Sequence, residues 1–71
     1  MEPGDIIVMF GLSAKGKNRI KRDGPEWTFA EVGNPQALSG RKSLRLVSVK
    51  HPTQTRWVLY SDDRHFSWRM K

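Results

Sequence analysis

A dense group of basic side chains is the strongest chemical signal in this sequence. Five of the thirteen Lys and Arg residues fall within the twelve positions from Ser13 to Gly24. They are Lys15, Lys17, Arg19, Lys21 and Arg22. Side chains of this kind neutralise phosphates and release the counterions around a nucleic acid, which gives affinity without sequence information. We therefore predict that this segment binds a phosphate backbone.

The same segment holds one apolar residue of appreciable size, Ile20, and so has little to bury. We expect a flexible basic loop, or the exposed arm of a hairpin, over residues 13–24. A competing explanation needs no ligand, because the charges of a solvated loop also keep a small protein soluble. The two explanations predict the same local structure and differ only in whether an anion is bound.

The charge of the whole chain points to the same class of partner. Its 71 residues carry thirteen Lys and Arg against seven Asp and Glu, a formal net charge of +6. A positive field of this density favours polyanions, meaning nucleic acid, an anionic membrane or an acidic protein surface. Because the basic segment has no apolar face to insert, a membrane-surface role ranks below the other two.

Catalytic and metal chemistry find little support. The chain has no cysteine, which excludes cysteine-based zinc sites, and two histidines, His51 and His65, cannot complete a tetrahedral site alone. Asp62 and Asp63 precede His65, but Ser-Asp-Asp between two strands is typical of a turn whose side chains cap their own backbone. The glycine spacing does not match a phosphate-binding loop of nucleotide enzymes. We expect a non-catalytic protein with no cofactor and no metal.

The elements that position the basic groups are predicted to be short strands. From Phe66 to Met70, large apolar side chains alternate with polar ones, as a strand with one buried face requires. Residues 41–50 and 56–60 precede it and complete a three-stranded meander. If the last two strands pair, their polar side forms a basic surface around one ring, made of Arg56, Tyr60, Arg69 and Lys71. Cations interleaved with an aromatic are typical of a nucleic-acid platform, although any half-buried sheet also needs a polar outer face.

Two further strands are predicted nearer the start of the chain. Residues 5–10 form a short, mostly apolar run that is rich in β-branched side chains and bracketed by glycines, which predicts a strand buried on both faces at the centre of the sheet. Residues 26–32 predict another strand, on which Trp27 and Phe29 share one face. These rings either fill the core or lie on the surface as a stacking platform for bases. The core is the favoured position, most of all for Phe29.

The predicted fold is one small all-β domain over residues 1–71. Asn34 and Pro35 suit the start of a helix and Gly40 suits its end, so one short helical turn is expected near residues 35–39. The rest is expected to form five or six strands of a strongly bent antiparallel sheet or barrel. Its length and strand spacing are similar to those of SH3-like and OB-like barrels, a likeness that transfers no functional residue. Closure would remove exposed sheet edges.

Two functions follow as hypotheses. The first is a small basic protein that binds DNA or RNA through the basic loop and the outer sheet face. The second is a protein-interaction module, an adaptor or an inhibitor of a larger enzyme, anchored by an exposed Trp27, Trp57 or Tyr60, because aromatics and arginines also dominate protein interfaces. No apolar run approaches the roughly 20 residues that cross a bilayer. We expect a cytoplasmic monomer or homodimer that does not use a membrane.

Overall fold

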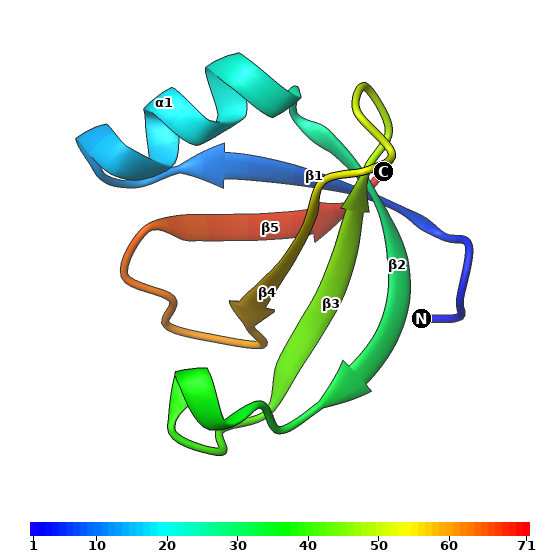
Figure 1. Ribbon diagram of the computed structural model, residues 1–71, viewed down its shortest axis with the longest axis vertical. Helices are drawn as coiled ribbons and strands as arrows, with labels where there is room; N and C mark the ends of the chain where they lie inside the picture. The colour runs from blue at the N-terminus through cyan, green and yellow to red at the C-terminus, as the bar shows by residue number, and fades with distance from the viewer.

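The computed structural model describes all residues 1–71 and contains one antiparallel sheet of five strands with a helix and a 3-10 turn (Figure 1). In chain order the elements are β1 (Ile6–Gly11), α1 (Ala14–Asp23), β2 (Glu26–Gly33), η1 (Gln36–Leu38), β3 (Ser43–Ser48), β4 (Thr55–Leu59) and β5 (Phe66–Met70). The predicted small all-β fold is confirmed, and η1 lies where one helical turn was expected. In Figure 1, β1 and β5 run across β3 and β4, so the sheet is strongly bent.

The strands follow the order β4-β3-β2-β1-β5, which makes β2 the central strand and β4 and β5 the edges. The expectation that residues 5–10 form the central strand is therefore wrong, because β1 lies one position off centre. The expectation that both faces of this strand are buried is wrong as well. Ile7 and Met9 are buried, whereas Phe10 on the opposite face is exposed. Because all five residues after Asp5 are apolar, the sequence hides this alternation.

The bend in the sheet is concentrated in β2. Its first residues pair with β1, where Ile7 lies opposite Trp27, while its full length pairs with β3. The register against β3 shifts between Phe29 and Glu31. An extra residue at such a bulge increases the local twist and bends the strand. The sheet can therefore wrap around one small core.

The core lies on the concave side of this sheet. Its eight buried residues are Ile7, Met9, Trp27, Phe29, Leu44, Leu46, Val58 and Phe66. The one polar group of the buried Trp27 side chain has a hydrogen-bond partner, because its Nε1 donates to the Gly24 carbonyl at 3.0 Å. The core position is thus confirmed for both Trp27 and Phe29, and neither ring is available as a surface stacking platform.

Residues 13–24 are the main departure from the expected structure. They form helix α1 instead of a loop or the arm of a hairpin. Ile20, the one large apolar residue of the segment, packs against the core cluster. A single partly buried apolar side chain is enough because the rest of the attachment is made by backbone contacts and by the caps at both ends of the helix.

Candidate nucleic-acid interface

Helix α1 begins and ends at capping residues. The Ser13 side chain is the N-cap, and its Oγ accepts a hydrogen bond from the Gly16 N–H at 3.1 Å. The same Oγ lies 2.6 Å from Nδ1 of His65, the residue that immediately precedes β5. At the other end, Gly24 adopts a φ of +84°, and its N–H donates to the Ile20 carbonyl at 2.8 Å. A serine start and a glycine with positive φ satisfy backbone groups that a helix end leaves free.

The inner side of α1 is attached to β1 and β5 by close backbone contacts. A Cβ added to Gly16 would lie 2.0 Å from the His65 carbonyl oxygen, a distance no side chain tolerates. A Cβ on Gly11 at the end of β1 would come within 2.4 Å of the Lys17 nitrogen. The His65 carbonyl also accepts a hydrogen bond from the Leu12 N–H at 2.8 Å. These glycines let the helix lie directly against the sheet, which fixes the direction of its outer side.

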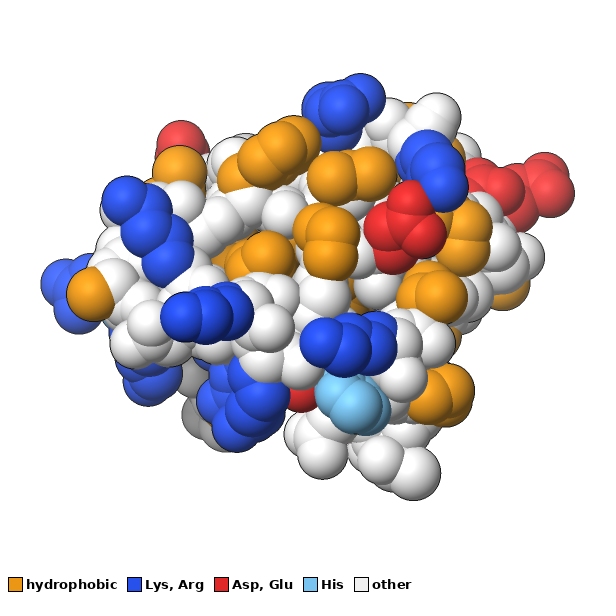
Figure 2. Space-filling view, turned by 90° about the horizontal axis from the view of Figure 1, so that it is seen from above, with side chains coloured by type: hydrophobic (Ala, Val, Ile, Leu, Met, Phe, Trp, Pro, Cys, Tyr) orange, Lys and Arg blue, Asp and Glu red, His pale blue; other side chains and the backbone are white.

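The solvent-exposed part of α1 carries all five predicted phosphate-binding residues, in two rows that follow the helical period: Lys15, Arg19 and Arg22 form one row, and Lys17 and Lys21 form the other. The two rows together are here called the basic face of α1. Arg19 is half-buried, and the other four are exposed. None of the three lysines forms an ion pair. Figure 2 shows Lys and Arg side chains gathered over the half of the molecule where α1 lies. The structure therefore places the basic run of the sequence on the exposed part of one short helix.

One carboxylate, that of Asp23, orders the arginines of this face. Asp23 is 1% exposed, and its two oxygens accept hydrogen bonds from Arg22 Nε at 3.1 Å and from a terminal nitrogen of Arg22 at 3.0 Å. Arg19 lies 3.8 Å from the same carboxylate. The Arg22 hydrogen bonds hold the pKa of Asp23 below its ordinary value, and the same contact raises the pKa of Arg22. One negative charge shared between two arginines leaves the helix strongly positive.

An open hollow on the outside of the helix is lined by Lys15, Asn18, Arg19 and Arg22. These residues are spaced three and four apart, which places them along one stripe of a helix. Asn18 was not among the predicted residues, and its amide adds both a donor and an acceptor among three cations. A helical period places Asn18 beside Lys15, Arg19 and Arg22, but the segment was expected to be a loop or the arm of a hairpin, where this period does not apply.

Arg56 does not join the outer sheet face, which corrects the prediction for this residue. It lies opposite Leu46 on the core side of the sheet, and its guanidinium is 4.6 Å from the centre of the Phe66 ring. Its Nε is buried without a hydrogen-bond partner. Burial lowers the pKa of Arg56, and the nearby charge of Arg19 lowers it further. Arg56 therefore closes the gap between β4 and β5 and is poorly placed to meet a phosphate backbone.

Tyr60 is separated from Arg69 and Lys71 as well, because β5 pairs with β1 and not with β4. Tyr60 lies under Lys42, whose Nζ is 4.0 Å from the ring centre, and makes an edge contact with Trp68. Arg69 points to the opposite face, where it lies over Phe10. Lys71 is paired with Glu26 on that side. The predicted surface of Arg56, Tyr60, Arg69 and Lys71 is not formed.

The acidic turn before β5 has a structural role. One oxygen of Asp63 accepts hydrogen bonds from the backbone N–H groups of His65 and Phe66, and the other accepts from the Leu59 N–H. The side chain thus ties the end of β4 to the start of β5, as an Asp in a turn commonly does. No group of three or more His, Asp or Glu side chains is placed to hold a metal ion.

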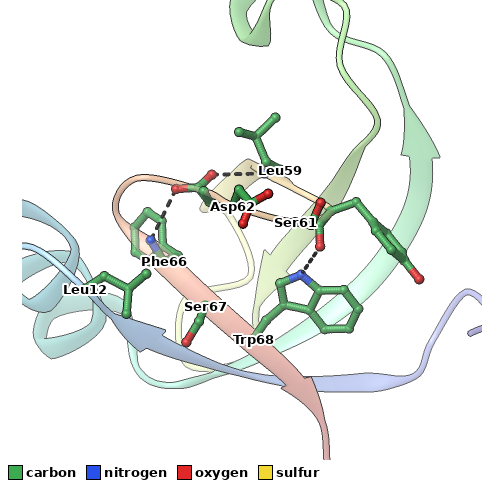
Figure 3. Close-up of a pocket in the computed structure, with 9 residues that line it drawn as sticks. Leu12, Leu59, Ser61, Asp62, Phe66, Ser67 and Trp68 are labelled. Atoms are coloured by element: carbon green, nitrogen blue, oxygen red, sulfur yellow. Dashed lines mark hydrogen bonds between the residues drawn. The ribbon is translucent and has the colours of Figure 1, made fainter.

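A second hollow, of about 340 Å³, lies beside this turn and contains exposed aromatic surface. Figure 3 shows Trp68 at one end of it, with Leu12 and Phe66 at the other. Trp68 Nε1 donates to the Tyr60 carbonyl at 3.1 Å, which fixes the indole at the open edge of the sheet. Of the aromatics proposed as protein-binding anchors, Tyr60 is exposed, Trp57 is half-buried and Trp27 is buried.

The chain matches no protein-family model, no curated protein and no solved structure. Its one α-helix has ten residues and is too short and too polar to cross a membrane. What the protein does is therefore inferred from its own residues and their placement.

Proposed function

We propose that this protein binds nucleic acid, holding the phosphate backbone on the basic face of α1. The observation that carries the proposal is the position of Lys15, Lys17 and Lys21, three exposed ammonium groups on one ten-residue helix with no carboxylate partner. Each such group can neutralise a phosphate and release a counterion. The shared charge of Asp23 keeps Arg19 and Arg22 in fixed positions beside them, so the surface is preorganised as well as positive.

The proposal predicts a specific change in salt dependence. Replacing Lys15, Lys17 and Lys21 together by glutamine should weaken binding to a fluorescently labelled 20-base-pair duplex. It should also reduce the slope of log K against log salt by about 0.9 for each phosphate that the variant no longer neutralises. Fluorescence anisotropy between roughly 50 and 200 mM salt measures both quantities, because several phosphate contacts change affinity strongly in this range.

The matched control removes the same amount of charge from another part of the surface. Arg41, Lys42 and Arg45 belong to β3 and the turn before it, and Figure 1 places the start of β3 at the far end of the molecule from α1. Changing these three to glutamine should leave most of the salt slope in place. An equal loss of affinity in both triple variants would mean that binding follows net charge alone, and it would overturn the assignment to α1.

The hollow beside Trp68 favours a second candidate function, binding of a protein partner. Tyr60 is 43% exposed at its rim, and exposed aromatics are common anchors in protein interfaces. Tyr60→Ala separates the two candidates. Loss of a captured partner, with oligonucleotide binding retained, would support the protein-interaction module. Loss of oligonucleotide binding would place this hollow within the nucleic-acid surface.

A further inference from the structure

The outer face of β1 carries apolar side chains where a solvent-facing strand normally carries polar ones. Ile7 and Met9 point into the core, so Ile6, Val8 and Phe10 lie on the opposite face. The side chain of Phe10 is the most accessible of the three, at 42% exposed. Figure 2 shows a group of hydrophobic side chains beside the basic ones of α1 on this side of the molecule.

Positive charge lies next to the Phe10 ring on its own sheet. Arg69 of β5 is paired with Val8, and Ser67 is paired with Phe10, so Arg69 is the diagonal neighbour of Phe10 on the same face. Its guanidinium carbon is 5.6 Å from the centre of the ring. Arg69 forms no salt bridge, and so its charge is free to meet an anion.

Helix α1 lies immediately beyond the end of the same strand. Phe10 is followed by Gly11, and the backbone of Lys17 lies so close to Gly11 that no Cβ fits between them. The first turn of α1 is therefore adjacent to the end of β1. Lys17 is exposed and unpaired. An exposed aromatic ring thus has an arginine beside it on its own face of the sheet and a basic helix at the end of its own strand.

We propose that Phe10 stacks on an unpaired base of a single-stranded nucleic acid, with Arg69 and Lys17 holding the phosphates on either side of that nucleotide. This inference rests on the proposed function and adds the class of nucleic acid. A phenyl ring offers no hydrogen bonds, so it takes any base through its flat face, and it reaches that face only where the base is unpaired. A fully paired duplex offers its phosphates to α1 but no base to Phe10. Single strands should bind more tightly than duplexes of the same length.

The test compares Phe10→Ala with the wild-type protein on three labelled probes, namely a 15-nucleotide oligo(dT), a 15-nucleotide oligo(U) and a 15-base-pair duplex. The variant should bind at least one single strand about 5- to 150-fold more weakly, the range expected for loss of one stacked ring. Duplex affinity should change less than twofold. The salt slope should not change on any probe, because no charge is removed. Phe10→Trp should restore single-strand binding.

Tyr60→Ala is the matched control, because Tyr60 is exposed to the same extent as Phe10 but lies on the other side of β5, beside Trp68. It should leave single-strand affinity unchanged. Phe10→Leu keeps the apolar area without an aromatic face, and it replaces the alanine variant if that one does not fold. Equal losses on single strand and duplex, or no loss at all, would overturn the stacking role while the salt slope of the lysine variant still supports α1. Failure of the wild type to bind any probe would overturn both proposals.

Discussion

Asp23 is the residue whose charge matters most to the folded helix. Arg22 donates two hydrogen bonds to its buried carboxylate and holds its pKa below the ordinary value. The folded state therefore binds that proton more weakly than the unfolded chain does, and the difference stabilises the fold at any pH above the unfolded pKa. This stabilisation disappears as the pH falls through the lower, folded pKa.

Asp23→Asn should consequently lower the melting temperature at pH 7, and by much less at an acid pH below the ordinary pKa of an aspartate. In that acid range the wild-type carboxyl is itself becoming protonated, so the two proteins converge. Thermal unfolding followed by circular dichroism at both pH values measures the difference. Glu31→Gln is the control, because that carboxylate is exposed and its single pairing with Arg45 should contribute little. A melting-temperature difference for Asp23→Asn that is the same at both pH values would contradict the role of the charge.

Arg56 shows why side-chain placement on β4 could not be predicted from the chain alone. Trp57 and Leu59 share one side of this strand and Val58 lies on the other, so alternation gives two faces of similar hydrophobicity. The choice is made by pairing with β3, where Leu44 lies opposite Val58 and Leu46 lies opposite Arg56. Both leucines face the core, and Arg56 follows them. Such register information is absent from a single strand considered by itself.

At the scale of elements, the position of α1 depends on a glycine. Alanine is the better helix former by about 1 kcal/mol, so Gly16→Ala would stabilise an isolated helix. In this protein the added methyl group would collide with the His65 carbonyl, which is backbone and cannot rotate away. Overpacking of this kind costs about 1 to 3 kcal/mol. We expect Gly16→Ala to reduce the free energy of unfolding, measured by urea titration.

Asn18→Ala provides the comparison on the same helix. Asn18 is exposed, so its substitution changes helix propensity without a steric conflict and should raise stability by a few tenths of a kcal/mol. Opposite signs for the two alanine variants would locate the effect at the contact between α1 and β5. If Gly16→Ala is as stable as the wild type or more so, the close approach of α1 to His65 is wrong.

The helix was the element that sequence patterns failed to predict, whereas the strands largely followed them. Phe66 to Met70 and the leucines of β3 alternate with polar residues because one face of the sheet is buried, and that pattern is visible in the chain. The segment of α1 has only Ile20 to bury, so it lacks an apolar stripe. Its caps, Ser13 and Gly24, are present in the sequence. Its anchoring to His65 comes from a residue 52 positions away from Ser13, which no local pattern reveals.

The candidate site was predictable to the extent that charge alone defines it. All five basic residues of the segment lie on one ten-residue helix, in two rows along its exposed part. The sheet platform failed because it required β4 to pair with β5, whereas these strands form the two edges of the sheet. Phe10 was overlooked because an uninterrupted apolar run suggested burial on both faces. The exposed position of its ring depends on β1 having only one covered face.

For the whole molecule, the net charge of +6 on 71 residues should make the free protein more stable as salt increases. Its like charges repel one another across a compact body, and screening weakens that repulsion. The ion pairs that screening weakens are few. Three of the four involve an exposed partner at Arg22, Glu31 or Lys71, and such pairs contribute little. We expect the melting temperature of the free protein to rise by a few degrees between about 50 and 500 mM sodium chloride.

Bound nucleic acid should respond to salt in the opposite direction. A ligand that binds only the folded state raises the melting temperature by an amount that grows with its concentration relative to Kd, and Kd for a polyanion increases steeply with salt. The increase in melting temperature produced by a fixed excess of oligo(dT) should therefore shrink over the same salt range in which the free protein becomes more stable.

The glutamine variant of Lys15, Lys17 and Lys21 should show a weaker salt stabilisation of the free protein and a weaker stabilisation by oligo(dT). The reason is that the same three charges cause the repulsion and bind the phosphates. A free protein that loses stability with salt would show that its ion pairs outweigh its repulsion. An oligo(dT) increment that does not change with salt would show that binding is not carried by phosphate contacts.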